Sequence, residues 1–441
     1  MGDTTAVDVE ALYRSRTPHS GRHFEDALHA LPGGVTHSSR YWPPYPLYVD
    51  RVAGSRMYDV DGNEYIEYWC ANGTMFVGHA HPQVRAAIAG VLDRGTHFGL
   101  SHELIPRLAR KVIELVPSAE SVRFAISGTE AIMHAMRIAR AYTGRRKVAH
   151  FEGTFHGVLD ELYVGTQAPF DRPDCAGIPP SAYQDTLILP FNDLEGTAEI
   201  LRRHRDDLAA VLIEPIAGAI PAEPAFLQGL RDLTRELGAL LVFDEIVTGF
   251  RLAPGGAQEL YGVLPDITVL GKVLGGGLPV GAVAGRRDVM ELLVPTRPLA
   301  RRVDIKGTYS GNVAVMAAGL ATLELLADGS MQRHAAALGA RMVRGLNGII
   351  AHTGEDACAS HYGCIFQIYF GLDRPPRDHR EQMKSDAARL KRFHLALMTQ
   401  GVFFKYGAEG RISGAHSEAD IDASLDRIET VIRRGMHRAA V

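Results

Sequence analysis

The sequence predicts an α/β fold with two domains: a large one on a doubly wound, mainly parallel sheet, and a smaller α+β one made from both ends of the chain. From about residue 105 to 320, short apolar runs alternate with amphipathic stretches. This alternation is typical of βαβ units in a sheet covered on both faces. The chain has 441 residues, of which 46% are apolar, so it is too long for one compact core. The alternation ends near residue 320, which predicts the second domain.

The expected elements follow in chain order. Residues 1–75 are expected to pack with the small domain, and the Asp61-Gly62 pair predicts a hairpin within residues 58–68. Residues 76–325 are expected to form the large domain. Its expected strands are 122–126, 147–151, 209–214, 240–244 and 267–270, and its expected helices are 130–142, 227–237 and 314–326.

Residues 326–441 are expected to form the small domain. They contain an apolar run at 364–370, a proline-rich charged loop at 374–380, a helix-like segment at 385–400 and a strand-like segment at 402–405. A last helix is expected to begin at Ser417, because Asp420 stands three residues later in a capping-box pattern.

Composition excludes several classes of protein. Basic residues number 47 and acidic residues 51, so the net charge is −4, and no basic run favours nucleic acid as a partner. No apolar run approaches the roughly 18 residues that a membrane helix needs, and the N-terminal region lacks the apolar block of a signal peptide. We therefore expect a cytoplasmic protein without a membrane span.

We expect no metal site. The four cysteines are irregularly spaced, which favours free thiols over a disulfide framework. Cys358 and Cys364 stand six residues apart near His361, and this is not a usual zinc spacing.

Two expected strand ends carry ionisable residues. The strand at 240–244 ends in Asp244, and the strand at 267–270 runs through Gly271 into Lys272. An isolated charge at a buried strand end is costly, so each residue needs a partner. A pyridinium ring that bears an aldehyde suits both, since its nitrogen pairs with an aspartate and its aldehyde condenses with a lysine. In the alternative interpretation, Asp244 caps the next turn and Lys272 is a surface lysine.

Ser127, Gly128 and Thr129 lie between an expected strand and an expected helix. The unpaired N–H groups and the positive dipole end of a helix N-terminus favour a phosphate there. An ordinary N-cap has the same pattern.

Two further segments have a functional and a structural interpretation. Phe155, which precedes His156 and Gly157, is suited to stack on a flat ring or to fill the core. The turn at 307–312 offers hydroxyl and N–H groups to a second phosphate face, or it caps the helix that follows.

These motifs belong to a longer ordered series. From the N-terminus it reads Pro32-Gly33-Gly34-Val35, Asp59-Val60-Asp61-Gly62, Gly78-His79-Ala80-His81-Pro82, Ser127-Gly128-Thr129-Glu130-Ala131, Phe155-His156-Gly157, Glu214-Pro215, Asp244-Glu245-Ile246, Gly271-Lys272, Gly275-Gly276-Gly277-Leu278-Pro279 and Gly307-Thr308-Tyr309-Ser310-Gly311-Asn312. Over nearly its whole length the chain resembles the fold-type-I, pyridoxal-phosphate-dependent class III aminotransferases. Within them it is most similar to the glutamate-1-semialdehyde aminomutase branch and its related amino-acid aminotransferases.

The resemblance implies a cofactor, pyridoxal 5'-phosphate, and a role for each matching residue. Lys272 becomes the lysine that forms the Schiff base and then acts as general base, and Asp244 becomes the partner of the pyridine nitrogen. The other implied cofactor contacts are Ser127, Gly128 and Thr129 at the phosphate, Phe155 and Ile246 at the two ring faces, and His156 and Glu214. The resemblance also implies a homodimer, in which Thr308 reaches the phosphate bound by the other subunit.

Arg40 and Arg411 match positions that bind a substrate carboxylate in related enzymes, and a bidentate arginine–carboxylate pair is the natural device for this task. Asn72 stands where the aminomutase branch has a tryptophan, which predicts a changed pocket wall. That branch reads Glu-Ala-Gly-Phe where this chain has residues 408–411, Ala-Glu-Gly-Arg. The acid is displaced and an arginine is gained, which argues against mutase chemistry.

The resemblance predicts a ping-pong aminotransferase that exchanges an amino group between a carboxylate-bearing α- or β-amino acid and a keto acid. The ornithine and GABA branches have a glutamate where Ala219 stands, so their ω-amino substrates are not expected. Three alternatives remain open. They are an intramolecular aminomutase of the glutamate-1-semialdehyde type, an amino-acid racemase or epimerase on the same fold, and a non-catalytic protein that binds a dinucleotide or a sugar phosphate.

Overall fold

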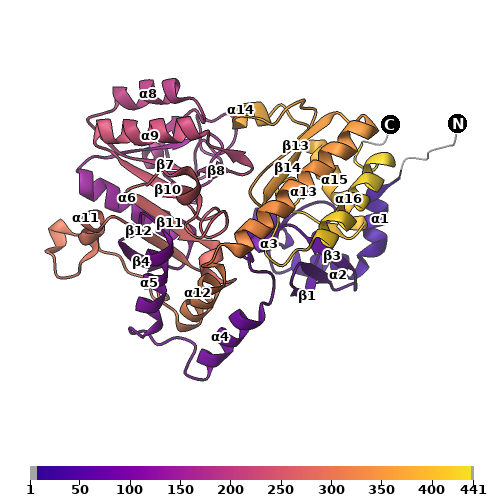
Figure 1. Ribbon diagram of the computed structural model, residues 1–441, viewed down its shortest axis with the longest axis horizontal. Coiled ribbons are helices and arrows are strands. Elements are labelled where there is room, and N and C mark those ends of the chain that lie inside the picture. Colours follow the sequence, from indigo (N-terminus) through magenta and orange to yellow (C-terminus); the bar gives the residue numbers. More distant parts are fainter. Residues whose placement is uncertain (1–6, 439–441) are drawn as a thin grey trace.

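A seven-stranded sheet organises the large domain, which forms one lobe of the molecule (Figure 1). The computed structural model describes residues 7–438. The strand order is β4-β12-β11-β10-β7-β5-β6, and β12 alone among these runs antiparallel to its neighbours. The strands are β4 (Ser121–Ala125), β5 (Lys147–Phe151), β6 (Thr186–Leu189), β7 (Leu208–Ile213), β10 (Leu240–Asp244), β11 (Ile267–Gly271) and β12 (Gly281–Gly285). The predicted mainly parallel sheet is confirmed.

Alternate residues of the central strands face two separate helical layers. Every residue of β7 and β10 is buried. Leu240 packs in one apolar core with α6 (Gly128–Thr143), whereas Leu241 packs in another with α9 (Pro224–Leu237). Because successive strand residues point to opposite faces, a strand covered on both sides needs apolar residues without interruption. The continuous apolar runs of the sequence therefore place these strands at the centre of the sheet.

The other elements of the large domain surround this sheet. They are α4 (Pro82–Leu92), α5 (Leu104–Leu115), α7 (Pro180–Tyr183), α8 (Leu194–Arg203), α10 (Ala257–Tyr261), α11 (Arg287–Met290), α12 (Val313–Leu326), the short strands β8 (Ile216–Ala217) and β9 (Ile220–Pro221), and the 3₁₀ turns η3 (Lys272–Gly275), η4 (Glu291–Leu293) and η5 (Leu299–Arg301). Within residues 7–438, no single helix is long and apolar enough to cross a membrane. Helix α12 and the following α13 (Ser330–Thr353) pass that test only as a pair, bent by 69°.

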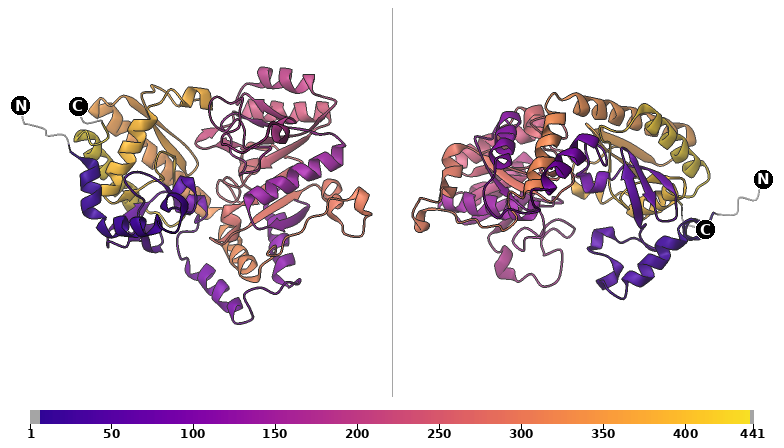
Figure 2. Two further views of the ribbon diagram at one scale, coloured as in Figure 1. Left: turned by 180° about the vertical axis from the view of Figure 1, so that it is seen from behind. Right: turned by 90° about the horizontal axis from the view of Figure 1, so that it is seen from below.

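The small domain forms the second lobe and contains the first and the last described helices of the chain (Figures 1 and 2). One of its sheets has the order β1-β2-β3-β15, so an N-terminal strand pairs with one from the C-terminal region. The other sheet is antiparallel, with the order β13-β14-β16. The strands are β1 (Val49–Ala53), β2 (Arg56–Asp59), β3 (Glu64–Glu67), β13 (Ala357–Tyr362), β14 (Ile365–Phe370), β15 (Val402–Phe403) and β16 (Gly410–Arg411). The remaining helical elements are α1 (Val9–Arg16), α2 (Pro18–Ala27), η1 (Pro32–Gly34), η2 (Ser38–Arg40), α3 (Cys70–Gly73), α14 (His379–Gln382), α15 (Ala387–Thr399) and α16 (Glu418–Arg433). This agrees with the predicted α+β domain made from both termini.

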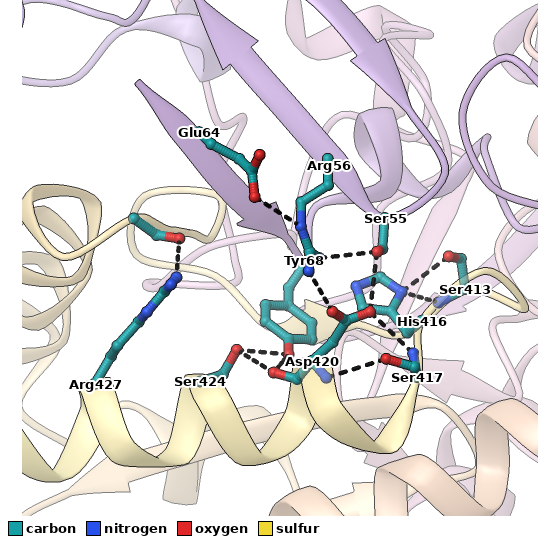
Figure 3. Close-up of polar contacts among 11 residues, drawn as sticks. Ser55, Arg56, Glu64, Tyr68, Ser413, His416, Ser417, Asp420, Ser424 and Arg427 are labelled. Atoms are coloured by element: carbon teal, nitrogen blue, oxygen red, sulfur yellow. Dashed lines mark hydrogen bonds and ion pairs between the residues drawn. The ribbon is translucent and has the colours of Figure 1, made fainter. Parts of the chain in front are cut away.

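A polar network around Asp420 fastens the N-terminal strands to α16 (Figure 3). Asp420 Oδ1 accepts a hydrogen bond of 2.5 Å from Arg56 Nη2, and Oδ2 accepts one of 3.0 Å from Ser55 Oγ. The capping box between Ser417 and Asp420 is present, as the sequence predicts. The hydroxyl groups of Tyr68 and Ser424 lie 2.8 Å apart. These contacts join the two ends of the chain in one domain.

The loop that carries α14 extends from the small domain to the large one (Figure 1). Arg380 donates hydrogen bonds of 2.5 and 2.6 Å to the two carboxylate oxygens of Glu152. Arg377 Nε donates to Glu223 Oε1 over 2.8 Å. Because Glu152 directly follows β5, the small domain holds the segment that leads into the candidate site.

Strand β12 was not predicted from the sequence. It reads Gly-Ala-Val-Ala-Gly, which lacks the large β-branched residues of its neighbours. Its small residues allow the strand to lie close to the backbone of Ser127, since a Cβ on Gly281 would lie 2.0 Å from the Ser127 carbonyl oxygen. Packing against the turn before α6 therefore explains a strand that residue preference does not indicate.

Candidate active site

Asp244 lies at the centre of the site, at the carboxyl end of β10. Its Oδ2 lies 2.7 Å from Nδ1 of His156, and its Oδ1 accepts a hydrogen bond of 3.1 Å from the backbone N–H of Ile246. The His156 ring follows β5 and is fully buried. Its Nε2 has no hydrogen-bond partner within residues 7–438. The sheet thus brings two of the predicted residues into direct contact and holds the carboxylate in one orientation.

Glu214 extends this cluster from the end of β7. One ligand atom each of His156, Glu214 and Asp244 lie within 4.8 Å of one another. Burial raises the pKa of the Glu214 carboxyl well above its usual range, and the nearby Asp244 raises it further.

Lys272 follows β11, the neighbour of β10 in the sheet. Its φ of 42° is in the left-handed region, which is unusual for a residue with a side chain and recurs at functional sites. Burial lowers the pKa of its amine to about 8, and the Arg411 guanidinium adds to this effect, against the opposing fields of Asp244 and Glu214. A lysine in this condition has a far larger neutral fraction near pH 8 than an ordinary lysine and can act as nucleophile or base.

The turn between β4 and α6 forms a cradle for an anion. Ser127 caps the helix by accepting a hydrogen bond of 3.2 Å from the N–H of Glu130. The N–H groups of Gly128 and Thr129, in the first turn, have no acceptor in the described part of the chain. Such free donors, together with the helix dipole, are suited to a phosphate.

Two glycines let the Ile246 side chain lie close to the backbone between this cradle and Lys272. A Cβ on Gly128 would lie 2.6 Å from Cδ1 of Ile246, and a Cβ on Gly271 would lie 3.4 Å from its Cγ2. The Ile246 side chain therefore packs against both glycine backbones. This arrangement leaves an apolar surface beside the carboxylate of Asp244, of the kind on which a planar ring can rest.

Phe155 and Thr308 are both exposed in the single chain. The Phe155 ring is 51% exposed and packs edge to face against Tyr163, with 6.1 Å between centroids. Thr308 lies in the turn after Gly307, beside residues 97–101, around a cavity of about 310 Å³. A Cβ on Gly307 would lie 3.4 Å from Oε1 of Glu130, so this turn approaches the first turn of α6. No described residue binds the Thr308 hydroxyl.

The small domain contributes a buried arginine to the site. Arg411, on β16, is 6% exposed and its Nη2 contacts Oε1 of Glu409. Its Nε and Nη1 have no partner in the described part of the chain. A Cβ on Gly73 would lie 3.3 Å from both Cδ of Arg411 and Nη2 of Arg251, so two guanidinium groups flank the same backbone.

Arg251 was missed in the sequence analysis. It is 1% exposed, lacks a carboxylate partner among the described residues, and donates to the carbonyl oxygens of Val247 and Gly73. Its guanidinium carbon lies 5.1 Å from the ring centroid of Phe76. The only signal in the sequence is its position seven residues after Asp244, in a segment that reads as an ordinary surface turn.

Arg40 and Asn72, the other predicted substrate contacts, are exposed. Arg40 Nη1 donates to Thr36 Oγ1 over 3.1 Å, and Asn72 Oδ1 accepts from Trp69 Nε1 over 3.3 Å. Neither side chain contacts Asp244 or Lys272 through a hydrogen bond. Arg40 lies near His37. Burial lowers the pKa of His37, and the positive charges of Arg40 and Lys405 lower it further.

The residues present fit pyridoxal 5'-phosphate. The free N–H groups of Gly128 and Thr129 suit its phosphate, the apolar side chain of Ile246 suits a face of its ring, and Asp244 supplies a carboxylate for the ring nitrogen. Lys272 supplies an amine of lowered pKa for its aldehyde. One edge of the sheet thus presents a group for each part of the cofactor: its phosphate, ring, ring nitrogen and aldehyde.

Comparisons with known proteins agree with this geometry. The model of the family described as Aminotransferase class-III matches residues 38–363. An ω-transaminase from Sphaerobacter thermophilus is 36% identical, with a TM-score of 0.91, and the match covers 97% of this chain and 100% of that one. A β-phenylalanine aminotransferase from Variovorax paradoxus is 32% identical, with a TM-score of 0.88 and coverage of 97% and 96%. A glutamate-1-semialdehyde aminomutase from Pseudomonas aeruginosa PAO1 is 24% identical, with the same TM-score and coverage, and this likeness concerns the fold alone.

Proposed function

The chain belongs to the class III aminotransferases, a pyridoxal 5'-phosphate-dependent family, and we propose that it exchanges an amino group between a carboxylate-bearing amino acid and a keto acid. The amino acid is of the α or β series, and the two half-reactions follow in ping-pong order. One observation carries the proposal: Asp244, Lys272 and the free N–H groups of α6 lie at one edge of the sheet, near the unfilled guanidinium of Arg411.

The cofactor-binding roles follow from the site. Gly128 and Thr129 bind the phosphate through their N–H groups, in a turn that Ser127 closes. Ile246 would hold one face of the cofactor ring, and the exposed ring of Phe155 would cover the other. His156 and Glu214 surround Asp244 and fix its carboxylate at the ring nitrogen.

Lys272 performs the proton transfer. When bound, the cofactor supplies a protonated ring that withdraws electrons from the Cα–H bond of the substrate. Lys272 attaches the cofactor at rest, and its released Nζ then takes the proton from Cα. With a pKa of about 8, much of this amine is neutral near pH 8, whereas an ordinary lysine near 10.4 is almost wholly charged.

Arg411 and Arg40 recognise the substrate carboxylate. Arg411 is the stronger candidate in the single chain, because its guanidinium is buried and two of its nitrogens lack partners in the described residues. A buried arginine bound to a carboxylate makes short, charge-assisted hydrogen bonds. The 32% identity to an enzyme described as a β-phenylalanine aminotransferase supports β-amino acids as donors. Asn72, which accepts a hydrogen bond from Trp69, changes the pocket wall relative to the tryptophan of the aminomutase branch.

A homodimer completes the proposal. Thr308 stands on an exposed turn, and the nearby Leu100 and Tyr309 are 82% and 60% exposed. Large apolar side chains gathered beside a site favour an interface, so we place the second subunit here, with Thr308 at its phosphate. Light scattering at several concentrations tests the dimer. Location in the cytoplasm stays a prediction from the sequence, which cell fractionation tests.

The decisive experiment is a single-turnover assay. Purified protein in the aminated cofactor form is mixed with candidate keto acids, and the cofactor absorbance is followed. An aminotransferase returns to the aldehyde form and releases one amino acid per site. An aminomutase converts its substrate without an added keto acid, and a racemase inverts Cα without releasing a keto product.

Lys272→Ala is the critical variant in this assay. We expect it to lose turnover and to lose covalent attachment, measured as a cofactor adduct on the Lys272 peptide after borohydride reduction. Lys384→Ala, at an exposed lysine, is the matched control and keeps both. An unchanged adduct in Lys272→Ala would refute the assignment of this lysine.

A further inference from the structure

Glu409 directly precedes the two-residue strand β16, and its carboxylate contacts the guanidinium of Arg411, the second residue of that strand. Gly410 between them is pressed against the core. A Cβ on Gly410 would lie 2.5 Å from Cζ of Phe366 and 2.7 Å from Cε1 of Phe404. Both charged side chains lie close enough to Lys272 for their charges to affect one another, since Arg411 lowers the pKa of Lys272 and Lys272 lowers the pKa of Glu409.

The contact between Glu409 and Arg411 leaves one edge of the guanidinium free to bind another carboxylate. A guanidinium presents two edges to a carboxylate, one formed by Nε and Nη2 and the other by Nη1 and Nη2. Glu409 contacts only Nη2, and Nε and Nη1 are both buried and have no partner within residues 7–438. Since Nη2 carries one hydrogen on each edge, a single contact blocks at most one of them. Arg411 can thus bind Glu409 and a second carboxylate at the same time.

The surrounding charges permit this second carboxylate. Burial alone would raise the pKa of Glu409, but Arg411, Lys405 and Lys272 together lower it below its usual value, so Glu409 stays ionised. Arg251 adds another buried cation next to Arg411. The field around Arg411 therefore stays positive even with Glu409 charged, and an anion is still attracted.

We propose that Glu409 is a positioning residue that holds the Arg411 guanidinium with one edge open, so that the substrate carboxylate binds a preoriented fork. This inference rests on the proposed function, because it assumes a carboxylate-bearing substrate. A free arginine side chain has many rotamers, and restricting it before binding improves affinity without any new contact. The backbone supports the same orientation, since the Arg411 N–H donates to the carbonyl oxygen of Tyr68 over 2.7 Å.

The test compares two amino donors that differ in the carboxylate. They are 3-amino-3-phenylpropanoate and 1-phenylethylamine, which lacks the carboxyl group. In Glu409→Ala we expect kcat/KM for the amino acid to fall about tenfold through a higher KM, and kcat/KM for the amine to change less than about twofold. Glu409→Gln, which still presents an oxygen to Nη2, is expected to stay within about threefold of the wild type for both donors.

A binding measurement gives a second readout that needs no turnover. Calorimetric titration of the holoenzyme with 3-phenylpropanoate, which has a carboxylate and no amine, measures the fork alone. We expect Glu409→Ala to raise its Kd about tenfold and Glu409→Gln to leave it nearly unchanged. Glu236→Ala, which removes a glutamate from an exposed pair with Arg202 of 3.0 Å, is the matched control and is expected to behave as the wild type.

Each other outcome decides against the inference or against its premise. Tighter binding in Glu409→Ala would show that Glu409 competes with substrate, and equal losses with both donors would show a purely structural role. A Glu409→Gln variant as poor as Glu409→Ala would show that charge matters and orientation does not. If the wild type aminated no keto acid in the single-turnover assay, the proposed function would fail, and calorimetry alone would then decide whether Glu409 positions Arg411.

Discussion

The two sides of the site are built in different ways. On the large domain, Asp244 and Lys272 follow fully buried strands in the middle of a seven-stranded sheet. On the small domain, Arg411 lies on a strand of two residues. Nearby, the residues from Cys70 to Gly73 all have positive φ, between 47° and 81°. The proposed reacting groups thus lie at the ends of buried strands, whereas the proposed substrate contact Arg411 lies on a short strand near a strained segment.

This difference separates chemistry from specificity. A sheet buried on both faces positions an attached side chain precisely, which proton transfer requires. Short segments accept substitutions without disturbing the core, so one scaffold can serve many substrates. The following predictions test whether the two sides act separately, beginning with the largest effect.

Removing the charge of Asp244 tests the sheet side most directly. We expect Asp244→Asn to lower kcat on the order of a thousandfold, because the ring nitrogen loses the carboxylate that keeps it protonated. KM for the amino acid is expected to change little, since Arg411 is untouched. Steady-state kinetics measure both, with Asp232→Asn on the exposed face of α9 as control. A large rise in KM with normal kcat would contradict the division.

Lys272 is expected to react as an unusually acidic ammonium group. Its folded pKa of about 8 lies below the ordinary value near 10.4, so near pH 8 its neutral fraction exceeds that of other lysines by roughly a hundredfold. In protein stripped of cofactor, reductive methylation of Lys272 is expected to reach half its maximum rate near pH 8, as measured by peptide mass spectrometry. Lys384, which is exposed, is the reference. A midpoint above about pH 10 would show that the site does not tune this amine.

The turn before α6 depends on a glycine in the neighbouring strand. In Gly281→Ala the new methyl group meets the Ser127 carbonyl oxygen and displaces the phosphate cradle. We expect cofactor affinity to fall at least about tenfold and the free energy of unfolding to fall by about 1 to 3 kcal/mol. Cofactor titration and urea unfolding measure the two effects. Gly90→Ala is the matched control, because α4 leaves open space at Gly90 and alanine favours a helix.

The same contrast explains what the sequence predicts. Strands β5 and β10 have the predicted bounds, and β10 and β11 are adjacent and parallel, so the residues at their carboxyl ends meet. A continuous apolar run that ends in a charged residue is a local signal of such a site. The fold class and the place of Asp244 beside Lys272 could therefore be predicted from short stretches of sequence.

The small-domain side has no such local signal. Arg411 contacts Glu409 on a strand that exists only because it pairs with β14, more than forty residues earlier in the chain. Arg251 donates to the carbonyl oxygen of Gly73, 178 residues earlier in the chain. Long-range packing decides these positions, and residue type alone does not distinguish a buried arginine from a solvated one.

A substitution at Asp420 tests whether the small domain can be destabilised without changing the groups on the large domain. Asp420→Asn weakens the ion pair with Arg56 and the contact with Ser55, and we expect a loss of about 2 to 3 kcal/mol in the free energy of unfolding. At the site we expect a rise in KM of only a few fold, since Tyr68, which accepts from Arg411, contacts this network. Asp422→Asn, in an exposed pair with Arg341 of 2.8 Å, is expected to cost under about 0.5 kcal/mol.

The pH dependence of this variant has a definite sign. Burial alone would raise the pKa of Asp420, but its hydrogen bonds with Arg56 and Ser417 lower it below the ordinary value. A carboxyl group with a lowered folded pKa stabilises the protein above its unfolded pKa, near 3.9, and loses that effect as the pH falls through the folded pKa. The difference in unfolding free energy between wild type and Asp420→Asn is therefore expected to be largest near neutral pH and to shrink below about pH 4. A difference that stays constant down to pH 3 would mean that shape, and not charge, joins the two ends of the chain.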